Sequence, residues 1–414
     1  MLSLSVLERL QKTNSDAEIW WDSLPSDYPS WRDGLLASAP NPRVWEKWSN
    51  ELGRFLNTED PASSFIRGVT TNPSLIAKSI VNSPAAWTPE IYRLVRHQSF
   101  ADVESTYWLL YQEVVRRAAN TMLPMWEKTQ GRYGWVSGQL DPQLVFDSDR
   151  MLAQGLLLGQ TAPNVMVKVP GSRQGYEVVR RLVAHGVSIN GTLSYTVPQF
   201  MECINAIEAG LAEARRRGVD TTRWRAVITH MIGRFGANQD LYDEAAARDI
   251  ELSPLDVRWA EVAILKRIHR IIKEKGYPVT MLLSSLAVDE RADGLDTLSM
   301  HVEETAGAGL VYTCKPRFIA DLMRREAEFD SFDSKAIERD VPPEIMKRLL
   351  RLPSFHRAFE PYGMQPEEFA HYGAFVDTYA EVIRSRRNLT DFVASRLEKI
   401  TETPDRGFVS IMNT

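Results

Sequence analysis

The sequence predicts an α/β fold: a (β/α)8 TIM barrel with extra helical insertions and a C-terminal helical extension. Three observations predict it. Short apolar runs recur along the chain and alternate with longer stretches of helical periodicity. Several of these runs are apolar throughout, as parallel strands covered on both faces are. We find eight such runs in 414 residues, and this length fits one barrel with insertions.

The strands are expected in order along the chain, and helical patterns separate them. The expected strands are Glu18–Asp22, Phe65–Val69, Gly134–Ser137, Val165–Val169, Val187–Asn190, Ala226–Thr229, Val279–Leu283 and Leu310–Thr313. The clearest helical patterns are Gly175–His185, Val197–Arg217, Pro254–Lys275 and Lys315–Ala327. Two long connections, Pro25–Arg54 and Asn82–Tyr133, exceed a minimal barrel and contain helical stretches of their own.

We expect residues 1–414 to form a single barrel domain, with the barrel core at about 17–328. The charged, helical extension at about 329–414 should pack back on the barrel. Its last strong helical pattern, Pro366–Arg384, has apolar residues at helical spacing: Phe369, Tyr372, Phe375, Tyr379 and Val382.

Composition excludes several classes of function. The net charge is -5, and Lys and Arg are mixed with Asp and Glu, which argues against a nucleic-acid partner. No apolar stretch approaches the roughly 18 residues that a membrane span needs. The N-terminus lacks a secretion signal, so we expect a cytoplasmic protein. Two cysteines and seven scattered histidines predict neither a disulfide framework nor a metal site, and no nucleotide-cofactor motif occurs. The sequence leaves the oligomeric state, a homodimer included, open.

Lys168 is the residue that most needs explaining, because it lies inside the apolar run Val165–Val169. A buried lysine is rare unless it is paired. It either snorkels between helices or forms a buried ion pair, or it is a desolvated amine with a lowered pKa, able to attack a carbonyl group. Pro-Gly-Ser follows at 170–172, as at a strand end, where barrel enzymes keep their chemistry.

Polar side chains follow other expected strands, and each has a plain structural explanation beside a functional one. Asp22 is either a helix cap or a general acid/base. The segment 68–76, Gly-Val-Thr-Thr-Asn-Pro-Ser-Leu-Ile, is turn and cap chemistry or a polar pocket wall. Asn190 and Thr192 lie two apart, so they face the same side. Arg234 follows Thr229 and a glycine; it is a surface residue or binds a phosphate.

Taken together and in this order, these segments resemble the transaldolase family. Val-Thr-Thr-Asn-Pro-Ser-Leu-Ile at 69–76 is similar to the family's Ala-Thr-Thr-Asn-Pro-Ser-Leu. Val-Lys-Val-Pro at 167–170 resembles the Lys-Ile-Pro segment around the family's Schiff-base lysine. Residues 186–199 resemble Gly-Ile-x-x-Asn-x-Thr-Leu-x-Phe-Ser-x-x-Gln, and Ile-Gly-Arg at 232–234 resembles the Val-Gly-Arg after the sixth strand.

The resemblance implies a role for each matching residue, with sugar phosphates as substrates and no cofactor. Lys168 would form the Schiff base, and Asp22 would move the proton of the hydroxyl group at the cleaved bond. Thr192 would orient a water molecule, and Gln139 occupies the position of a further acid/base residue. The residues that would bind substrate are Thr70, Asn72 and Asn190 for the dihydroxyacetone moiety, and Thr229, Arg234 and Ser284 for the phosphate.

Three departures from the family pattern bear on the activity. Gln139 stands where transaldolases have a glutamate, and glutamine cannot exchange a proton. The related fructose-6-phosphate aldolases have glutamine there together with a tyrosine after the sixth strand, where this chain has Met231. Leu286 replaces an arginine of the family's Ser-x-Arg, which removes one charge partner of a phosphate. The long, Trp-rich connections are unusual in length for the family.

Three functions are therefore compared. The first is transfer of a dihydroxyacetone unit between sugar phosphates, in the pentose phosphate pathway or a specialised one. The second is an aldolase, a lyase, acting on another donor; Gln139 and Leu286 keep it open. The third is a sugar-phosphate-binding barrel without catalysis, which the presence of Lys168 disfavours. His230 is the one histidine near the expected site, and it would replace the missing glutamate only if it faced inward.

Overall fold

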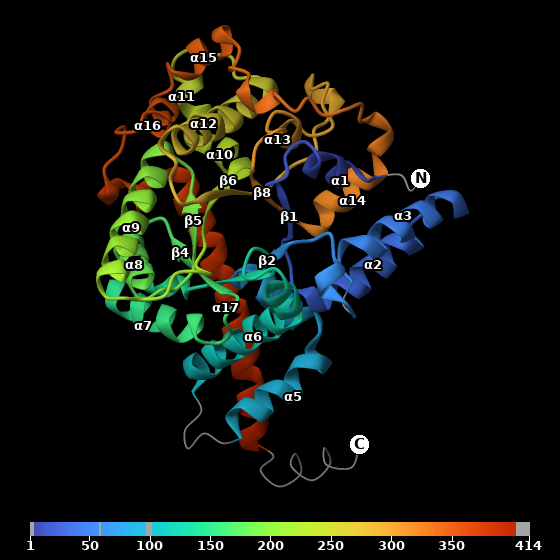
Figure 1. Cartoon of the computed structure of the whole chain (residues 1–414), viewed down its shortest axis with the longest axis vertical. Helices are drawn as coiled ribbons and strands as arrows, with labels where there is room; N and C mark the ends of the chain where they lie inside the picture. The colour runs from blue at the N-terminus through green and yellow to red at the C-terminus, as the bar shows by residue number, and fades with distance from the viewer. Residues whose placement is uncertain (1–3, 58, 97–101, 403–414) are drawn as a thin grey trace.

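The computed structural model describes residues 4–57, 59–96 and 102–402. Eight strands in these residues close into a barrel, and each pairs in parallel with its neighbours in chain order. Figure 1 shows them around the centre of the molecule, with α6 to α9 outside. The predicted (β/α)8 barrel is confirmed. Its strands are β1 Glu18–Trp21, β2 Gly68–Thr70, β3 Trp135–Gln139, β4 Val165–Pro170, β5 Ile189–Ser194, β6 Ala226–Met231, β7 Thr280–Ser284 and β8 Val311–Cys314.

Helices follow the strands and also fill the long connections. They are α1 Val6–Gln11, α2 Tyr28–Ala37, α3 Pro42–Phe55, α4 Pro73–Asn82, α5 Pro84–Val95, α6 Val103–Lys128, α7 Ser148–Gly159, α8 Arg173–Ala184, α9 Val197–Arg216, α10 Ile232–Gly236, α11 Gln239–Ala246, α12 Pro254–Lys275, α13 Met300–Glu303, α14 Pro316–Arg324, α15 Pro343–Leu349, α16 Pro353–Phe359 and α17 Gly373–Glu402. Short 3-10 turns lie between some of them, including η3 Pro142–Leu144, η5 Glu326–Glu328 and η7 Pro366–His371.

Large side chains fill the amino end of the barrel, where the strands begin. One buried cluster there contains inward-facing residues of six strands, Trp20, Trp135, Met166, Val227, Leu282 and Val311, together with Trp126 of α6. Gly68 makes room for it, because a Cβ atom at that position would lie 2.4 Å from the ring of Trp20. Side chains alternate between the two faces of a strand. The next inward residues along these strands therefore lie toward the carboxyl end.

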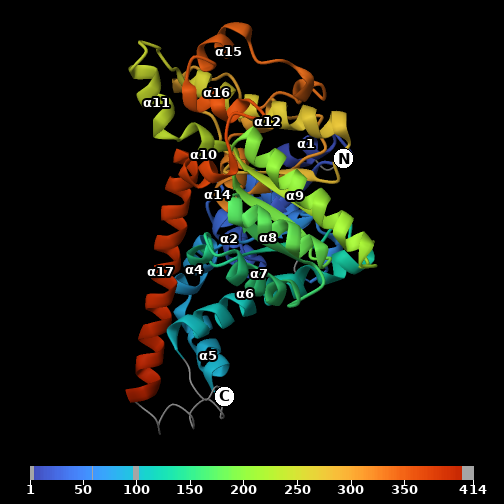
Figure 2. The same cartoon turned by 90° about the vertical axis from the view of Figure 1, so that its left-hand side faces the viewer.

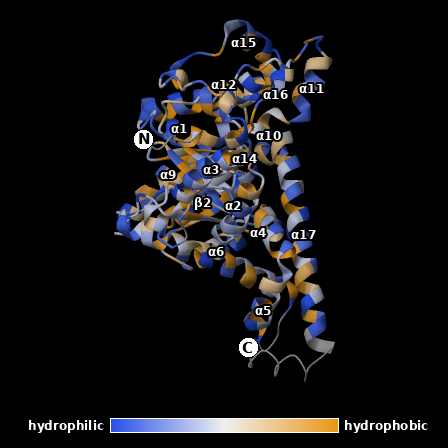
Figure 3. Cartoon of the chain, turned by 90° about the vertical axis from the view of Figure 1, so that its right-hand side faces the viewer, coloured by the Kyte–Doolittle hydropathy of each residue, from blue (hydrophilic) through white to orange (hydrophobic). Residues whose placement is uncertain are grey.

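The C-terminal extension contains one long helix, α17, which packs against α4, α6, α10 and β5. In Figure 2 it runs along one side of the molecule from α10 to α5, and Figure 3 shows apolar and polar residues along its whole length. The expected single helix Pro366–Arg384 is wrong in one respect. The turn η7 ends at His371, and α17 begins at Gly373. Tyr372 between them is extended and buried, and its ring stacks on Phe235, which separates the two elements.

No helix among the described residues is both long and apolar enough for a membrane span.

Candidate active site

Lys168 lies near the carboxyl end of β4 and faces the barrel interior, two residues beyond the inward Met166. It pairs in register with Gln139 of β3 on one side and with Asn190 of β5 on the other. Its exposed fraction is 6%, and no hydrogen bond of its amine is found among the described residues. Burial lowers the pKa of Lys168; the negative charge of Asp22 opposes this effect, and the positive charge of Lys315 adds to it.

Asp22 follows β1 and is buried at the same end. The Thr70 hydroxyl group donates a hydrogen bond of 2.7 Å to its Oδ1 atom. Thr313 of β8 lies against the same Thr70 hydroxyl, so three neighbouring strands contribute to one polar cluster. Sequence reasoning missed Thr313. The available signal was its spacing, because it lies two residues after the inward Val311.

Asn190 is held from both sides in the barrel interior. Its side-chain amide donates to the Ser137 hydroxyl group at 2.9 Å, and its carbonyl oxygen accepts from Thr229 at 2.6 Å. These contacts determine which way the amide group points, because the donor and the acceptor each have a partner. Ser137 was not predicted as part of the site. Thr229, expected near a phosphate, orients Asn190 in this arrangement.

Thr192 and Asn72 lie where β5 and β2 lead into their loops. Thr192 is buried and pairs in register with Pro170, just before Leu193, whose φ of 54° marks an irregular end of the strand. The Asn72 side-chain oxygen caps α4 by accepting from the backbone of Leu75 at 2.9 Å. Its amide nitrogen is not used in the cap, so one donor group is left for other contacts.

Arg234 lies in α10, directly after β6, and Ser284 is the last residue of the neighbouring strand β7. Gly233 allows the close approach, because a Cβ atom there would lie 2.3 Å from the Ser285 carbonyl oxygen. The Ser284 hydroxyl group is buried and has no hydrogen-bond partner among the described residues. Arg234 forms an ion pair of 2.5 Å with Glu381 of α17. A serine hydroxyl without a partner and a guanidinium group can both donate to an anion.

A model of the transaldolase/fructose-6-phosphate aldolase family matches residues 59–352, more than half of the chain. The chain belongs to this family. A transaldolase of Mycobacterium leprae (strain Br4923) is 30% identical over 194 residues, 46% of this chain and 50% of the relative. A transaldolase of Thiobacillus denitrificans (strain ATCC 25259 / T1) is 30% identical over 218 residues, 52% and 54% of the two chains. This chain thus spans about half the length of the curated relatives it matches.

One solved structure shows a weak similarity. The malate synthase of Haloferax volcanii, in a pyruvate/acetyl-CoA ternary complex, gives a TM-score of 0.28 at 12% identity, over 71% of this chain and 88% of that chain. A score this low supports no inference about this chain.

His230 does not replace the glutamate that the transaldolase pattern has at position 139. Val227 faces the interior, so Thr229 and Met231 do as well, and His230 faces the surrounding helices. It is fully buried against Phe200, and burial lowers its pKa to about 4. The alternative in which His230 takes over acid/base work is therefore wrong, because strand alternation turns the ring away from Lys168. Met231 is the inward residue.

Gln139, the chain's departure from transaldolases, is buried beside Lys168, and its backbone N–H donates to the Tyr111 hydroxyl group at 2.9 Å. Two residues later, Asp141 accepts hydrogen bonds from Arg386 of α17. The carboxyl end of β3 thus contacts both the interior and the C-terminal helix.

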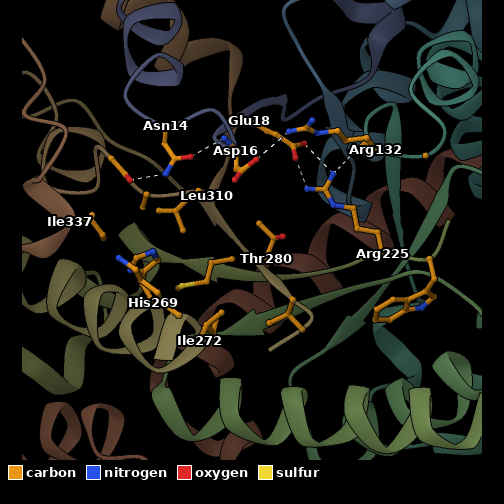
Figure 4. Close-up of a pocket in the computed structure, with 18 of the residues that line it drawn as sticks. Asn14, Asp16, Glu18, Arg132, Arg225, His269, Ile272, Thr280, Leu310 and Ile337 are labelled. Atoms are coloured by element: carbon orange, nitrogen blue, oxygen red, sulfur yellow. Dashed lines mark hydrogen bonds and ion pairs between the residues drawn. The ribbon is translucent and has the colours of Figure 1, made fainter. Parts of the chain in front are cut away.

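A cavity of about 680 Å³ lies at the opposite, amino end of the barrel. Figure 4 shows two ion pairs in its lining, Glu18 with Arg225 and Asp16 with Arg132. The tryptophan-rich layer around Trp20 and Trp135 lies between this end and Lys168. Conserved chemistry in barrel enzymes lies at the carboxyl end. We therefore assign the candidate site to the cluster around Lys168.

Proposed function

We propose that this chain is a transaldolase-type enzyme that transfers a dihydroxyacetone unit between sugar phosphates through a Schiff base on Lys168. The observation that supports this most is the buried amine of Lys168 at the carboxyl end of a barrel of this family. Burial lowers the pKa of this amine. Attack on a carbonyl group requires the neutral amine, and a lowered pKa increases its fraction at neutral pH. The related transaldolases point to the same chemistry.

In the first half-reaction the Lys168 nitrogen bonds to the ketone carbon of the donor sugar. A proton is taken up and water leaves, which gives a protonated imine. The Asp22 carboxylate then accepts the proton of the hydroxyl group two carbons away. The bond between the carbon that carries this hydroxyl group and the carbon next to the imine carbon breaks. Its electron pair moves toward the imine nitrogen, and an aldehyde departs. The protonated imine is the electron sink, so Asp22 only needs to move a proton.

In the second half-reaction the same steps run in reverse with another aldehyde. The enamine carbon attacks the acceptor carbonyl carbon, and Asp22 returns its proton to the new alkoxide. Water then hydrolyses the imine, which releases the lengthened ketose and the free Lys168 amine. In this scheme Thr192 orients the water. Gln139 can hydrogen-bond that water but cannot take its proton.

Substrate binding is proposed to divide between two groups of residues. Those for the dihydroxyacetone moiety are Thr70, Asn72 and Asn190, and those for the phosphate are Arg234, Ser284 and Thr229. The paired hydrogen bonds of Asn190 support the first group, because they aim a fixed amide toward the interior. The Ser284 hydroxyl without a partner supports the second.

A lyase outcome is the second candidate, and Gln139 is the observation that favours it. The rate of imine hydrolysis distinguishes a lyase from a transferase only indirectly, so analysis of the released products is the better test. With a donor and no acceptor, a lyase releases free dihydroxyacetone over many turnovers. A transferase retains the unit on the enzyme until an acceptor aldehyde arrives.

The test is borohydride trapping with fructose 6-phosphate, followed by mass measurement of the intact protein and peptide mapping. We expect one reduced adduct, located on Lys168 and absent from Lys168→Met. Lys266 of α12 provides a matched control: it too is buried with a lowered pKa, but it is paired with Glu304, which follows α13. Lys266→Met should still form the adduct. A folded wild-type protein that traps no sugar would contradict the proposal and favour a binding protein. An adduct on another residue would contradict the role of Lys168 and assign the imine to that residue.

A further inference from the structure

The helix α17 crosses the carboxyl end of the barrel, close to the proposed phosphate-binding residues. It packs against β5, α10 and the turn η3 that follows β3. Figure 2 shows its course from α10 past α4. On the β3 side its Arg386 is buried and forms ion pairs with Asp141 and Glu104. On the β6 side its Glu381 is paired with Arg234.

The Glu381 carboxylate takes the place on Arg234 that an anionic ligand would use. The ion pair joins Arg234 Nη2 and Glu381 Oε2 at 2.5 Å, and about a third of the arginine side chain is still exposed (33%). No other partner of the Arg234 side chain is found in the described part of the chain. Leu286, at 9% exposed, adds no charge on the β7 side. An incoming phosphate therefore meets a cation whose charge is already balanced.

Anchoring α17 does not require this ion pair. Partly exposed ion pairs stabilise a fold little. The helix has stronger attachments in the buried side chains of Phe375, Leu389 and Val393, and in Arg386, of which 3% is exposed. A carboxylate paired with a guanidinium that follows β6, at the carboxyl end of the barrel, thus has a second consequence: it changes how anions bind to that guanidinium.

We propose that Glu381 is a specificity-determining residue that competes with the anionic group of a phosphorylated sugar for Arg234. The inference rests on the proposed function for its substrates. The competition weakens binding of phosphorylated ketoses and leaves binding of uncharged ketoses largely unchanged. The site therefore prefers phosphorylated ketoses less strongly than it would if Arg234 had no ion pair. A phosphate that binds must displace Glu381 from Arg234.

The test compares Glu381→Gln with the wild-type chain, using inorganic phosphate and two donors. Inorganic phosphate should bind Glu381→Gln roughly tenfold more tightly in calorimetry, the effect of one charge-assisted hydrogen bond made available. The KM for fructose 6-phosphate should fall by a similar factor. The concentration of dihydroxyacetone that gives half-maximal borohydride trapping should change far less. The gain should disappear in an Arg234→Ala background, because the competition needs both residues.

Asp391→Asn is the matched control. Asp391 is an exposed carboxylate on α17, ten residues after Glu381, and no ion pair of Asp391 is found among the described residues. Its replacement should alter neither phosphate binding nor the KM for fructose 6-phosphate. Unchanged phosphate binding in Glu381→Gln, or an equal gain in Asp391→Asn, would overturn the inference. Absence of any Lys168 adduct would instead overturn the proposed function, and phosphate calorimetry would still test the competition at Arg234.

Discussion

Asp22 acts on two neighbours in the proposed site. It accepts the hydrogen bond of Thr70, and its negative charge opposes the effect of burial on the Lys168 pKa. A residue that only served the amine would affect imine formation, whereas a residue that moves protons would affect bond cleavage. Replacing the carboxylate by an amide of the same shape separates the two roles.

We predict that Asp22→Asn still forms the imine but turns over roughly 10²–10⁴-fold more slowly, the usual contribution of general acid/base catalysis. Loss of the carboxylate also lets burial lower the Lys168 pKa further. The amine is then neutral at lower pH, and the pH midpoint of borohydride trapping should move down. Stopped-assay turnover and trapping between pH 5 and 9 measure both. Near-native turnover would assign the proton transfer to another group.

Sequence reasoning found the residues of the site that break a pattern and missed those that follow one. Lys168 is conspicuous because a cation interrupts an apolar strand. Ser137 and Thr313 are small hydroxyl residues that any strand accommodates, and only the closed barrel brings them beside Asn190 and Thr70. The partner of Arg234 was beyond reach, since 147 residues separate it from Glu381.

At the scale of elements, the packing of α3 against α1 and η5 buries a carboxyl group without a hydrogen-bond partner. Glu51 of α3 is 1% exposed, and neither of its oxygens accepts a hydrogen bond from the described residues, although Lys47 Nζ lies 4.0 Å from Oε1. Its pKa is raised to about 7, mainly by burial and then by the negative charges of Glu326 and Glu8, while Lys47 and Arg54 oppose the increase. The protonated form is therefore favoured in the native state.

We predict that Glu51→Gln stabilises the protein at pH 8 but not at pH 4.5. Because the folded pKa exceeds the unfolded one, the native state binds the extra proton, and stability falls as pH rises between about 4.5 and 7. Glutamine removes this loss, about 3 kcal/mol for a shift of this size. Urea unfolding at several pH values measures it. Glu46→Gln, an exposed change on the same helix, is the control; an equal gain there would refute the account.

The strands were predictable as elements because each contains an apolar run that burial on both faces requires. All eight overlap their expected positions, including β4 at Val165–Pro170. The ends were less predictable, because they depend on tertiary contacts. The break before α17 follows from the stacking of Tyr372 on Phe235, and these residues are 137 positions apart. Local periodicity continues through the break, so it indicated one helix.

At the scale of the whole molecule, α17 joins parts of the chain that are distant in sequence. Arg386 links it to Asp141 after β3 and to Glu104 of α6, and the guanidinium group lies over the ring of Tyr107. The helix also packs against α4 and β5. We infer from these contacts that the extension and the barrel unfold together, as expected of a single domain.

We predict that hydrogen exchange in urea shows α17 peptides losing protection at the same urea concentration as peptides of β4. Arg386→Met should lower that common midpoint through a loss of about 3 kcal/mol in the free energy of unfolding, because the buried Asp141 carboxylate is left without its cation. Arg357→Met supplies the control, since it breaks an exposed ion pair with Glu368 outside α17 and should cost about 0–1 kcal/mol. If α17 instead opens at lower urea than β4, the extension is a separate unit that docks on the barrel. In that case Arg386→Met would weaken the docking and leave the β4 midpoint where it was.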